Sequence, residues 1–340
     1  MRLLVTGGCG FIGSNFIRMV LRDRPDVVVC NMDNLGYAGN PANLALVERE
    51  YPGRYFFERA DIADADAARG VMRGHRIEAL VNFAAESHVD RSIEDASPFV
   101  RSNVLGVVVL LQAALEAKLG RFVQVSTDEV YGSLPLEARN AAFTEDSPLA
   151  PNSPYSASKA SADLFCRAFF KTHGLPLVIT RCSNNYGPYQ FPEKLIPFMF
   201  FRAMRDEPLP VYGDGQNVRD WIHVEDHCRG VLMALEKGRD GTVYNFGGGA
   251  QRSNLYVVRE ILKFCGKDES LIRPVRDRPG HDRRYAVDYS LAAAELGFSP
   301  GLGFEEGLSR TLAWYRENSD WVGGATSGSY LYDMRKRYGE

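Results

Sequence analysis

Short apolar runs recur along the first part of the chain, and most of them are followed by a helical pattern. We predict strands at residues 2–6, 27–32, 55–57, 79–83, 122–125 and 177–180. Helices are predicted from the segment after residue 13 to about residue 22, from 98 to 118, and from 155 to 172. Alternating strands and helices are typical of right-handed βαβ units, so we expect a parallel sheet that is covered on both faces.

This alternation ends after Arg181, where short apolar segments are separated by several Pro and Gly breaks. Two later apolar segments, Val231–Leu235 and Val243–Phe246, are expected to return to the main sheet. The predicted fold class is α/β, a Rossmann-type doubly wound parallel sheet with a smaller mixed α/β lobe that binds the substrate. The expected domains are residues 1–183, joined by 222–247, and residues 184–340.

Composition excludes several classes of protein. Forty basic and 43 acidic residues give a net charge of -3, and without a basic run we expect no nucleic-acid partner. Six scattered cysteines without C-x-x-C spacing are typical of reduced thiols, and with no signal peptide they favour the cytoplasm. The longest apolar run, around Val107–Leu111, is shorter than a membrane span, and His223 and His227 alone do not make a metal site.

Gly7, Gly10 and Gly13 lie between the first predicted strand and its helix. Glycines allow a tight turn and a close approach to a pyrophosphate, which the helix amino terminus then attracts. Asp33 closes the second strand, where a carboxylate bonds the ribose hydroxyls and repels a 2′-phosphate. The pattern predicts an NAD site in the first domain. Asp61–Ile62, at the next strand end, is placed to meet the adenine or is an ordinary loop.

Tyr155 and Lys159 form Y-x-x-x-K. On a helix these two side chains share a face, so a phenol and an ammonium can enter the same cavity. A lysine cation and an oxidised nicotinamide nearby are expected to lower the pKa of the phenol. The alternative is a packed tyrosine beside a solvated lysine.

Thr127, Asp128 and Glu129 follow the fifth predicted strand, at the edge where open α/β sheets hold their chemistry. Two adjacent carboxyls in an apolar neighbourhood resist ionising together, so one can act as an acid and the other as a base. The alternative is a strand exit with two solvated acids.

These motifs resemble those of the extended short-chain dehydrogenase/reductase superfamily, and within it the dTDP-glucose 4,6-dehydratases. The similarity extends over most of the chain and is carried by residues 37–40, 84–92, 126–132, 184–189, 192–197 and 278–282. Sugar-nucleotide epimerases share the Gly turn and Y-x-x-x-K but usually lack the Asp-Glu pair. The chain departs from the family at Gly36, usually Thr, and at Cys9, usually Ala, so cofactor affinity is in question more than the reaction.

The resemblance implies a lyase that turns dTDP-glucose into dTDP-4-keto-6-deoxy-glucose and water with tightly bound NAD. C4 is oxidised, water is eliminated across C5–C6, and hydride returns to C6. Tyr155 takes the 4-hydroxyl proton and Thr127 holds that hydroxyl. Glu129 removes the C5 proton, and protonated Asp128 protonates the departing 6-hydroxyl.

The resemblance also implies binding residues. For NAD these are Gly7, Gly10, Phe11, Ile12, Gly13, Asp33, Asn34, Leu35, Gly36, Asp61, Ile62, Phe83, Ala84, Ala85, Ser87, Ser102, Tyr155, Lys159 and Asn185. For the nucleotide sugar they are Ser87, Thr127, Asp128, Glu129, Asn184, Lys194, Leu195, Pro210, Tyr212, Arg219, Asn254, Asp277, Arg278 and His281. Family members pair the two helices 98–118 and 155–172 between copies, which implies a homodimer through a four-helix bundle.

Other functions stay open at this stage. On the same scaffold the chain could be a UDP- or GDP-sugar dehydratase, an epimerase or a decarboxylase. A non-catalytic protein that senses a dinucleotide would keep the Gly turn and lose the catalytic group. Thr127, Asp128, Glu129, Tyr155 and Lys159 are all present, which argues against such a sensor.

Overall fold

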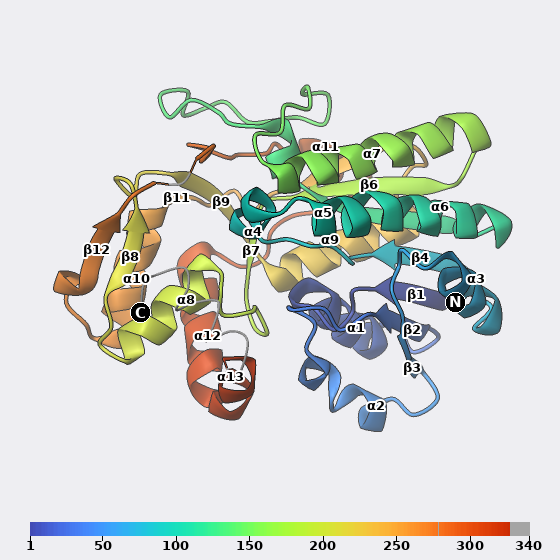
Figure 1. Cartoon of the computed structure of the whole chain (residues 1–340), viewed down its shortest axis with the longest axis horizontal. Helices are drawn as coiled ribbons and strands as arrows, with labels where there is room; N and C mark the ends of the chain where they lie inside the picture. Colours follow the sequence, from blue (N-terminus) through green and yellow to red (C-terminus); the bar gives the residue numbers. More distant parts are fainter. Residues whose placement is uncertain (278, 327–340) are drawn as a thin grey trace.

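A seven-stranded parallel sheet forms the centre of the computed structural model, which describes residues 1–277 and 279–326 (Figure 1). Its strand order is β10-β6-β5-β4-β1-β2-β3, and every neighbouring pair is parallel. The strands are β1 (Arg2–Thr6), β2 (Val28–Asp33), β3 (Tyr55–Arg59), β4 (Ala79–Asn82), β5 (Arg121–Thr127), β6 (Leu177–Cys182) and β10 (Val243–Phe246). The predicted Rossmann-type sheet is confirmed.

Alternating side chains of these strands feed two separate apolar cores, because successive residues of a strand face opposite sides of the sheet. Leu4 and Leu80 pack with the helices of one face, whereas Leu3 and Val5 pack with those of the other. The first face carries α3 (Ala65–Gly74), α6 (Val107–Glu116) and α7 (Pro154–His173). The second carries α1 (Phe11–Asp23) and α9 (Val224–Lys237) (Figure 1). Both faces of the sheet are therefore buried.

The two apolar segments expected to return to the sheet do so in different ways. Val231–Leu235 lies within α9, whose Val231 and Leu235 pack on the second face of the sheet. Val243–Phe246 is the edge strand β10, which pairs with β6. The predicted division into two domains, one of residues 1–183 joined by 222–247 and the other of residues 184–340, stays a prediction.

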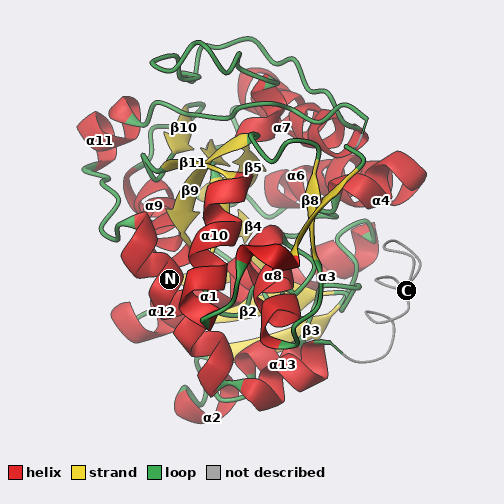
Figure 2. Ribbon diagram, turned by 90° about the vertical axis from the view of Figure 1, so that its left-hand side faces the viewer, coloured by secondary structure: helices red, strands yellow, loops and turns green. Residues whose placement is uncertain are grey.

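The rest of the chain forms a smaller lobe with its own aromatic core (Figure 2). β7 (Asn184–Tyr186), β9 (Val218–His223) and β11 (Gln251–Ser253) make a three-stranded sheet, and β8 (Leu209–Tyr212) pairs with β12 (Ile272–Val275). Its helices are α8 (Leu195–Met204), α10 (Asn254–Cys265), α12 (Phe304–Glu317) and α13 (Ser319–Ala325). The remaining helices are α2 (Val47–Glu50), α4 (Val89–Glu94), α5 (Ser97–Phe99) and α11 (Ser290–Leu296).

The helix predicted from 98 to 118 runs from Ser97 to Glu116, with a wider π-helical turn at Val100–Gly106 between α5 and α6. By length and apolarity alone this helix could cross a membrane, but half of it is buried inside the molecule. The buried side of this helix packs on the sheet, so part of its apolar surface belongs to the protein core.

Candidate active site

A large pocket opens at the carboxyl ends of the central strands and is lined on its other side by residues 182–196. Parallel strands all end at one edge, so residues that are far apart in sequence meet there. Seventeen of the nineteen predicted NAD residues line it: Gly7, Gly10, Phe11, Ile12, Gly13, Asp33, Asn34, Gly36, Ile62, Phe83, Ala84, Ala85, Ser87, Ser102, Tyr155, Lys159 and Asn185. It also contains Thr127, Asp128, Glu129, Asn184, Lys194 and Leu195.

The Gly turn places the amino terminus of α1 at the floor of this pocket. Gly7 has φ +68°, and a Cβ there would lie 2.6 Å from the Cα of Ala84. A Cβ on Gly13 would lie 2.4 Å from the carbonyl oxygen of Gly7. Gly10 caps the helix without a side-chain bond, so the first backbone N–H groups of α1 are available to a phosphate.

Asp33 is buried at the end of β2, where each of its oxygens accepts one backbone N–H. Cys9 N donates to Oδ2 at 2.9 Å and Leu35 N donates to Oδ1 at 2.8 Å. Burial raises the pKa of this carboxyl, and the two backbone bonds oppose that shift. Each oxygen keeps a second acceptor position, so the carboxyl can still accept ribose hydroxyls.

Two predicted NAD residues lie outside the pocket lining. Leu35, at φ 57°, packs against the core of the second sheet face. Asp61 accepts a hydrogen bond from Ala63 N at 2.8 Å and pairs with Arg101 at 2.9 Å. Of the two departures from the family, Cys9 points into the core, whereas Gly36 lines the pocket.

Tyr155 sits in the first turn of α7, which starts at a capping box. Ser153 and Ser156 satisfy each other's backbone N–H groups, and Pro154 opens the helix. Tyr155 is buried, and the side chain of Thr127 is close enough to act on the pKa of its phenol. The Y-x-x-x-K motif therefore faces the end of β5.

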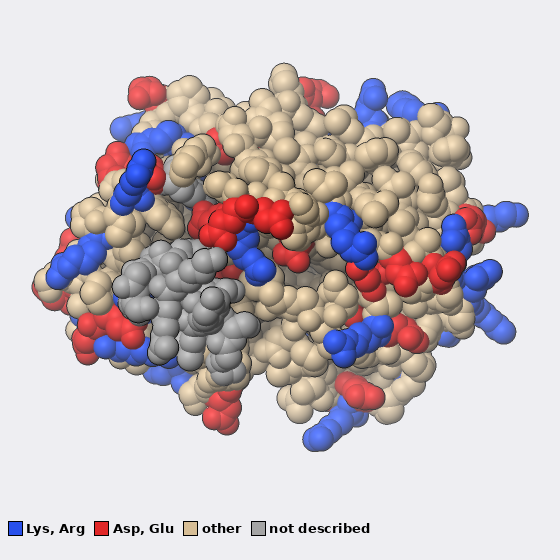
Figure 3. Space-filling model, viewed as in Figure 1, with Lys and Arg blue, Asp and Glu red and all other residues tan. Residues whose placement is uncertain are grey.

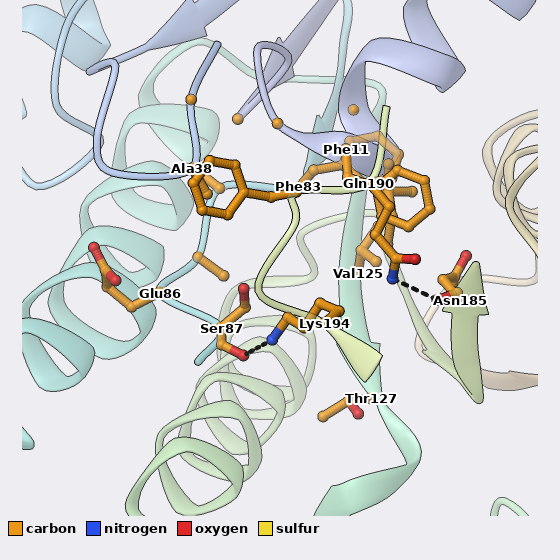
Figure 4. A pocket seen from close by; sticks show the side chains of 18 of the residues that line it. Phe11, Ala38, Phe83, Glu86, Ser87, Val125, Thr127, Asn185, Gln190 and Lys194 are labelled. Carbon is orange, nitrogen blue, oxygen red and sulfur yellow. Dashed lines mark hydrogen bonds between the residues drawn. The ribbon is translucent and has the colours of Figure 1, made fainter. Parts of the chain in front are cut away.

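Lys159 lies one turn further along α7 and donates from Nζ to the carbonyl oxygen of Val125 at 2.7 Å. Figure 4 shows Val125 and Thr127 along β5 at the wall of the pocket. Burial lowers the pKa of Lys159, and nearby Asp163 opposes that shift. The lysine is thus a buried group held against the strand, which excludes the alternative of a solvated side chain.

The surroundings of Tyr155 act on the pKa of its phenol in both directions. Burial, and then the charge of Glu129, raise this pKa well above its ordinary value, whereas the Thr127 side chain opposes the shift. The prediction of a lowered pKa applies to a site that also holds an oxidised nicotinamide, so it stays a prediction.

Asp128 has the surroundings of a carboxylic acid that keeps its proton. It is buried, and burial followed by the charges of Glu129 and Asp220 raises its pKa well above the ordinary value. Thr127 Oγ1 lies 3.4 Å from Oδ1, while the buried Oδ2 has no hydrogen-bond partner. Asp220 is itself buried and has its pKa raised to about 6 by burial. The upward shift in the pKa of Asp128 agrees with the acid role expected for this residue.

Several buried polar atoms along the pocket have no partner in the structure. They are Ser126 Oγ, Asp128 Oδ2, Ser183 Oγ, Asn184 Oδ1, Gln190 Oε1 and Trp221 Nε1. Buried polar groups are normally hydrogen-bonded, so such a row at one pocket is typical of a site that binds a polar ligand. Together with the Gly turn and Asp33, it fits a dinucleotide and a nucleotide sugar.

The other predicted substrate residues lie on the smaller lobe, outside the pocket lining. Arg219 donates to the carbonyl oxygen of Asp282 at 2.9 Å, and its charge acts on Asp128, so it lies close to the acid pair. His281 Nδ1 is 2.6 Å from Asp277, and its ring contacts that of Tyr212. Pro210 lies on β8 and Asn254 begins α10; Arg278 lies outside the described residues.

Sequence reasoning assigned no role to several residues that line the pocket or orient it. Tyr37, Gln190, Phe191, Glu193 and Trp221 all line it. Asn103, in the π-helical turn, bonds both backbone groups of Glu86 at 2.9 Å and Ser158 at 2.8 Å. Tyr37 and Glu193 lie within sequence segments that carry the family resemblance. That resemblance was the one sequence feature that pointed to them.

The two neighbouring histidines have structural roles. His223 caps α9 by accepting from Glu225 N, and His227 Nδ1 lies 2.9 Å from Asn185 Oδ1. Within residues 1–277 and 279–326, no cluster of three His, Cys, Asp or Glu side chains is arranged to hold a metal ion.

Comparisons with known proteins agree with this geometry. The pattern of the GDP-mannose 4,6 dehydratase family matches residues 4–311. A dTDP-glucose 4,6-dehydratase of Streptomyces niveus is 51% identical over 325 residues, which cover 94% of each chain. The crystal structure of DesIV, a dTDP-glucose 4,6-dehydratase of Streptomyces venezuelae with NAD bound, has a TM-score of 0.90 at 51% identity, covering 94% of this chain and 98% of that one. A UDP-glucose 4-epimerase of Thermus thermophilus reaches 0.85 at 30% identity, covering 94% and 100%.

The raised pKa of Asp220 makes stability depend on pH. A carboxyl whose pKa is higher in the folded than in the unfolded state stabilises the fold below its unfolded pKa, and this contribution is lost as pH rises through the folded value. With a shift from 3.8 to about 6, the loss falls between pH 4 and 7. We expect the free energy of unfolding of wild type, relative to Asp220→Asn, to fall by on the order of 2–3 kcal/mol over that range. Urea unfolding at several pH values measures this, and a pH-independent difference would contradict it.

Proposed function

The chain belongs to the family of dTDP-glucose 4,6-dehydratases, and from that premise we propose how its side chains divide the work of the reaction. It is an NAD-dependent hydro-lyase that converts dTDP-glucose to dTDP-4-keto-6-deoxy-glucose and water. The single observation that carries our division of roles is the meeting of Tyr155 with the Thr127-Asp128-Glu129 segment in one pocket. An epimerase needs no such pair of carboxyls, whereas an elimination of water needs an acid and a base.

We assign NAD to the Gly turn, Asp33 and the residues around the ends of β1, β2 and β4. The amino terminus of α1 would take the pyrophosphate, and Asp33 the ribose hydroxyls. When bound, NAD accepts hydride from C4 of the hexose and returns it to C6. The separation of the chain into an NAD-binding part and a nucleotide-sugar-binding part follows the domain boundary predicted above.

Tyr155 is the base for the 4-hydroxyl proton in this proposal. The Thr127 side chain lies close to the phenol, and its hydroxyl can bond the sugar oxygen. Lys159, fixed on the Val125 carbonyl, supplies positive charge on the same helix face. Since burial holds the phenol neutral in the protein alone, we infer that ionisation of Tyr155 belongs to the loaded site.

Glu129 and Asp128 carry out the elimination. Once C4 is a ketone, the C5 proton is acidic, and Glu129 removes it as base. Asp128, which burial and the neighbouring carboxyls favour as a neutral acid, donates its proton to the leaving 6-hydroxyl. Because Glu129 removes one proton and Asp128 donates another, the 6-hydroxyl leaves as water and no free hydroxide forms in the pocket. C5 takes up a proton again when hydride returns to C6, which completes the 6-deoxy product.

We assign the nucleotide sugar to Ser87, Asn184, Lys194 and Leu195 in the pocket, and to a second group on the smaller lobe. The described members of that group are Pro210, Tyr212, Arg219, Asn254, Asp277 and His281, and Arg278 is assigned with them from the resemblance alone. A diphosphate needs cations, and Lys194 lines the pocket while the charge of Arg219 acts on Asp128.

The substrate assignment predicts a clear preference among sugar nucleotides. The protein, incubated with dTDP-, UDP- or GDP-glucose and no added cofactor, should give the alkaline absorbance of a 4-keto product with dTDP-glucose. A product formed only from UDP- or GDP-glucose would overturn the thymidine assignment, and an epimer without a keto intermediate would overturn the reaction.

Replacing the acid should separate the two halves of the reaction. In Asp128→Asn we expect loss of water to slow by about 10²-fold or more, because general acid catalysis is removed, while C4 oxidation slows much less. Single-turnover absorbance of NADH at 340 nm reports oxidation, and the alkaline assay reports product. If oxidation and water loss fell equally, the division of roles between Asp128 and Glu129 would be wrong.

We also infer a homodimer and a cytoplasmic location. Val100 and Leu105 beside α6, and Leu164 and Phe165 on α7, are between 41% and 57% exposed, so core packing does not account for them. The face above α6 and α7 shows few charged side chains (Figure 3). Such a face supports pairing of these helices between two copies. All six cysteines are free, as is usual in a reducing compartment.

The dimer is tested by a charge on this face. Leu164→Glu should convert the protein from twice the chain mass to the chain mass in light scattering after size exclusion, because a carboxylate would be buried without a partner. Arg73→Glu on exposed α3 is the control and should leave the mass unchanged. A wild-type protein that is monomeric at micromolar concentration would refute the inference.

A further inference from the structure

Residues 188–194, which we call the strap, join β7 to α8 and line the pocket with Gln190, Phe191, Glu193 and Lys194. At its start the strap is held by α1. Asn15 Nδ2 donates to the carbonyl oxygen of Pro188 at 2.9 Å, and the guanidinium of Arg18 lies 4.8 Å from the ring centre of Tyr189. Figure 4 shows the strap passing Phe11 at Gln190 and reaching Ser87 at Lys194.

At its end the strap is held through Glu193, whose side chain is only 4% exposed. Tyr37, from the loop after β2, donates its hydroxyl to Oε1. His88, at the exit of β4, has Nε2 3.3 Å from Oε2. His88 Nδ1 already accepts the backbone N–H of Arg91 as the cap of α4, so the ring proton is on Nε2 and points at Glu193.

The Tyr37 side chain is fixed from both sides. The guanidinium of Arg91 lies 4.0 Å from its ring centre, and Phe191 of the strap meets the ring edge-on at 5.6 Å. Burial and Glu193 raise the pKa of the phenol well above its ordinary value, so it remains a donor across the working pH range. Glu193 therefore joins three segments: the strap, the loop after β2 and the segment after β4.

Lys194, the next residue, is bonded to the same side of the pocket. Its Nζ donates to the carbonyl oxygen of Ser87 at 2.8 Å and lies 3.7 Å from Glu193 Oε1 (Figure 4). The strap thus connects a residue assigned to the nucleotide sugar with a carboxylate that contacts the loop next to Asp33.

We propose that Glu193 is a positioning residue that keeps the strap closed along the dinucleotide pocket, so that NAD stays bound between turnovers. This rests on the proposed assignment of NAD to the pocket and adds a reason for its retention. Tyr37 contacts Glu193 from the loop after β2, and His88 contacts it from the segment after β4. Opening the strap requires both of these contacts of a buried carboxylate to part, and breaking bonds to a buried charged group is costly.

The experiment compares Glu193→Gln and Tyr37→Phe with wild type and with Glu236→Gln, a control that alters the exposed pair with Arg24. NAD released by denaturing the purified protein is counted per chain, and the rate of NAD loss from the folded protein is followed by dilution. We expect both strap variants to lose NAD about tenfold faster or more, as loss of a bond to a buried charged group predicts, and to purify with less of it. The control should match wild type.

Tyr37→Phe removes one hydroxyl and keeps the ring, so it tests the proposal even if Glu193→Gln does not fold, which circular dichroism detects. Saturating NAD should restore turnover in both variants. Rates of NAD loss within twofold of wild type in the folded variants would overturn the proposal, as would slow turnover with NAD fully bound. If wild type retains NAD but does not dehydrate dTDP-glucose, the proposed function fails while the retention assay still decides the role of Glu193.

Discussion

The contact on which the site depends is the one between the end of β5 and the first two turns of α7. Lys159 bonds the Val125 carbonyl, and Tyr155 lies close to Thr127, so the helix is held against the end of the strand. Because Asp128 follows Thr127 directly, the same contact buries its carboxyl beside Glu129. A phenol, a neutral acid and a second carboxyl then face one pocket without long, mobile side chains.

The surrounding fold serves this contact. The central strands are apolar on both faces, so helices cover the sheet and only its carboxyl edge is open to a ligand. At that edge the Gly turn brings α1 against β4 with no room for a Cβ. The strap then ties the smaller lobe to the exits of β2 and β4 through Glu193. The Gly turn, the acid pair and Lys194 therefore line one pocket.

Much of this arrangement could be predicted from the sequence, because it follows from local patterns. Apolar runs identified the strands, and the glycines and Tyr155–Lys159 spacing identified the cavity. The pKa of Tyr155 could not be predicted, since its direction depends on how completely the phenol is buried. Leu35 was assigned through the family resemblance, and Asp61 also through its place at a strand end, but side-chain direction decides whether such a residue enters the pocket. The strap's bonds link segments over 100 residues apart, which no local pattern indicates.

The most direct test of the account follows one hydrogen atom. With dTDP-glucose that carries deuterium at C4, and with no added cofactor, the account predicts a 4-keto-6-deoxy product whose C6 methyl group carries that deuterium, as detected by NMR or mass spectrometry. Such a transfer requires the reactions at C4, C5 and C6 to take place in one pocket without release of the reduced cofactor. A product without deuterium at C6, or no product until external NAD is turned over in stoichiometric amounts, would contradict it.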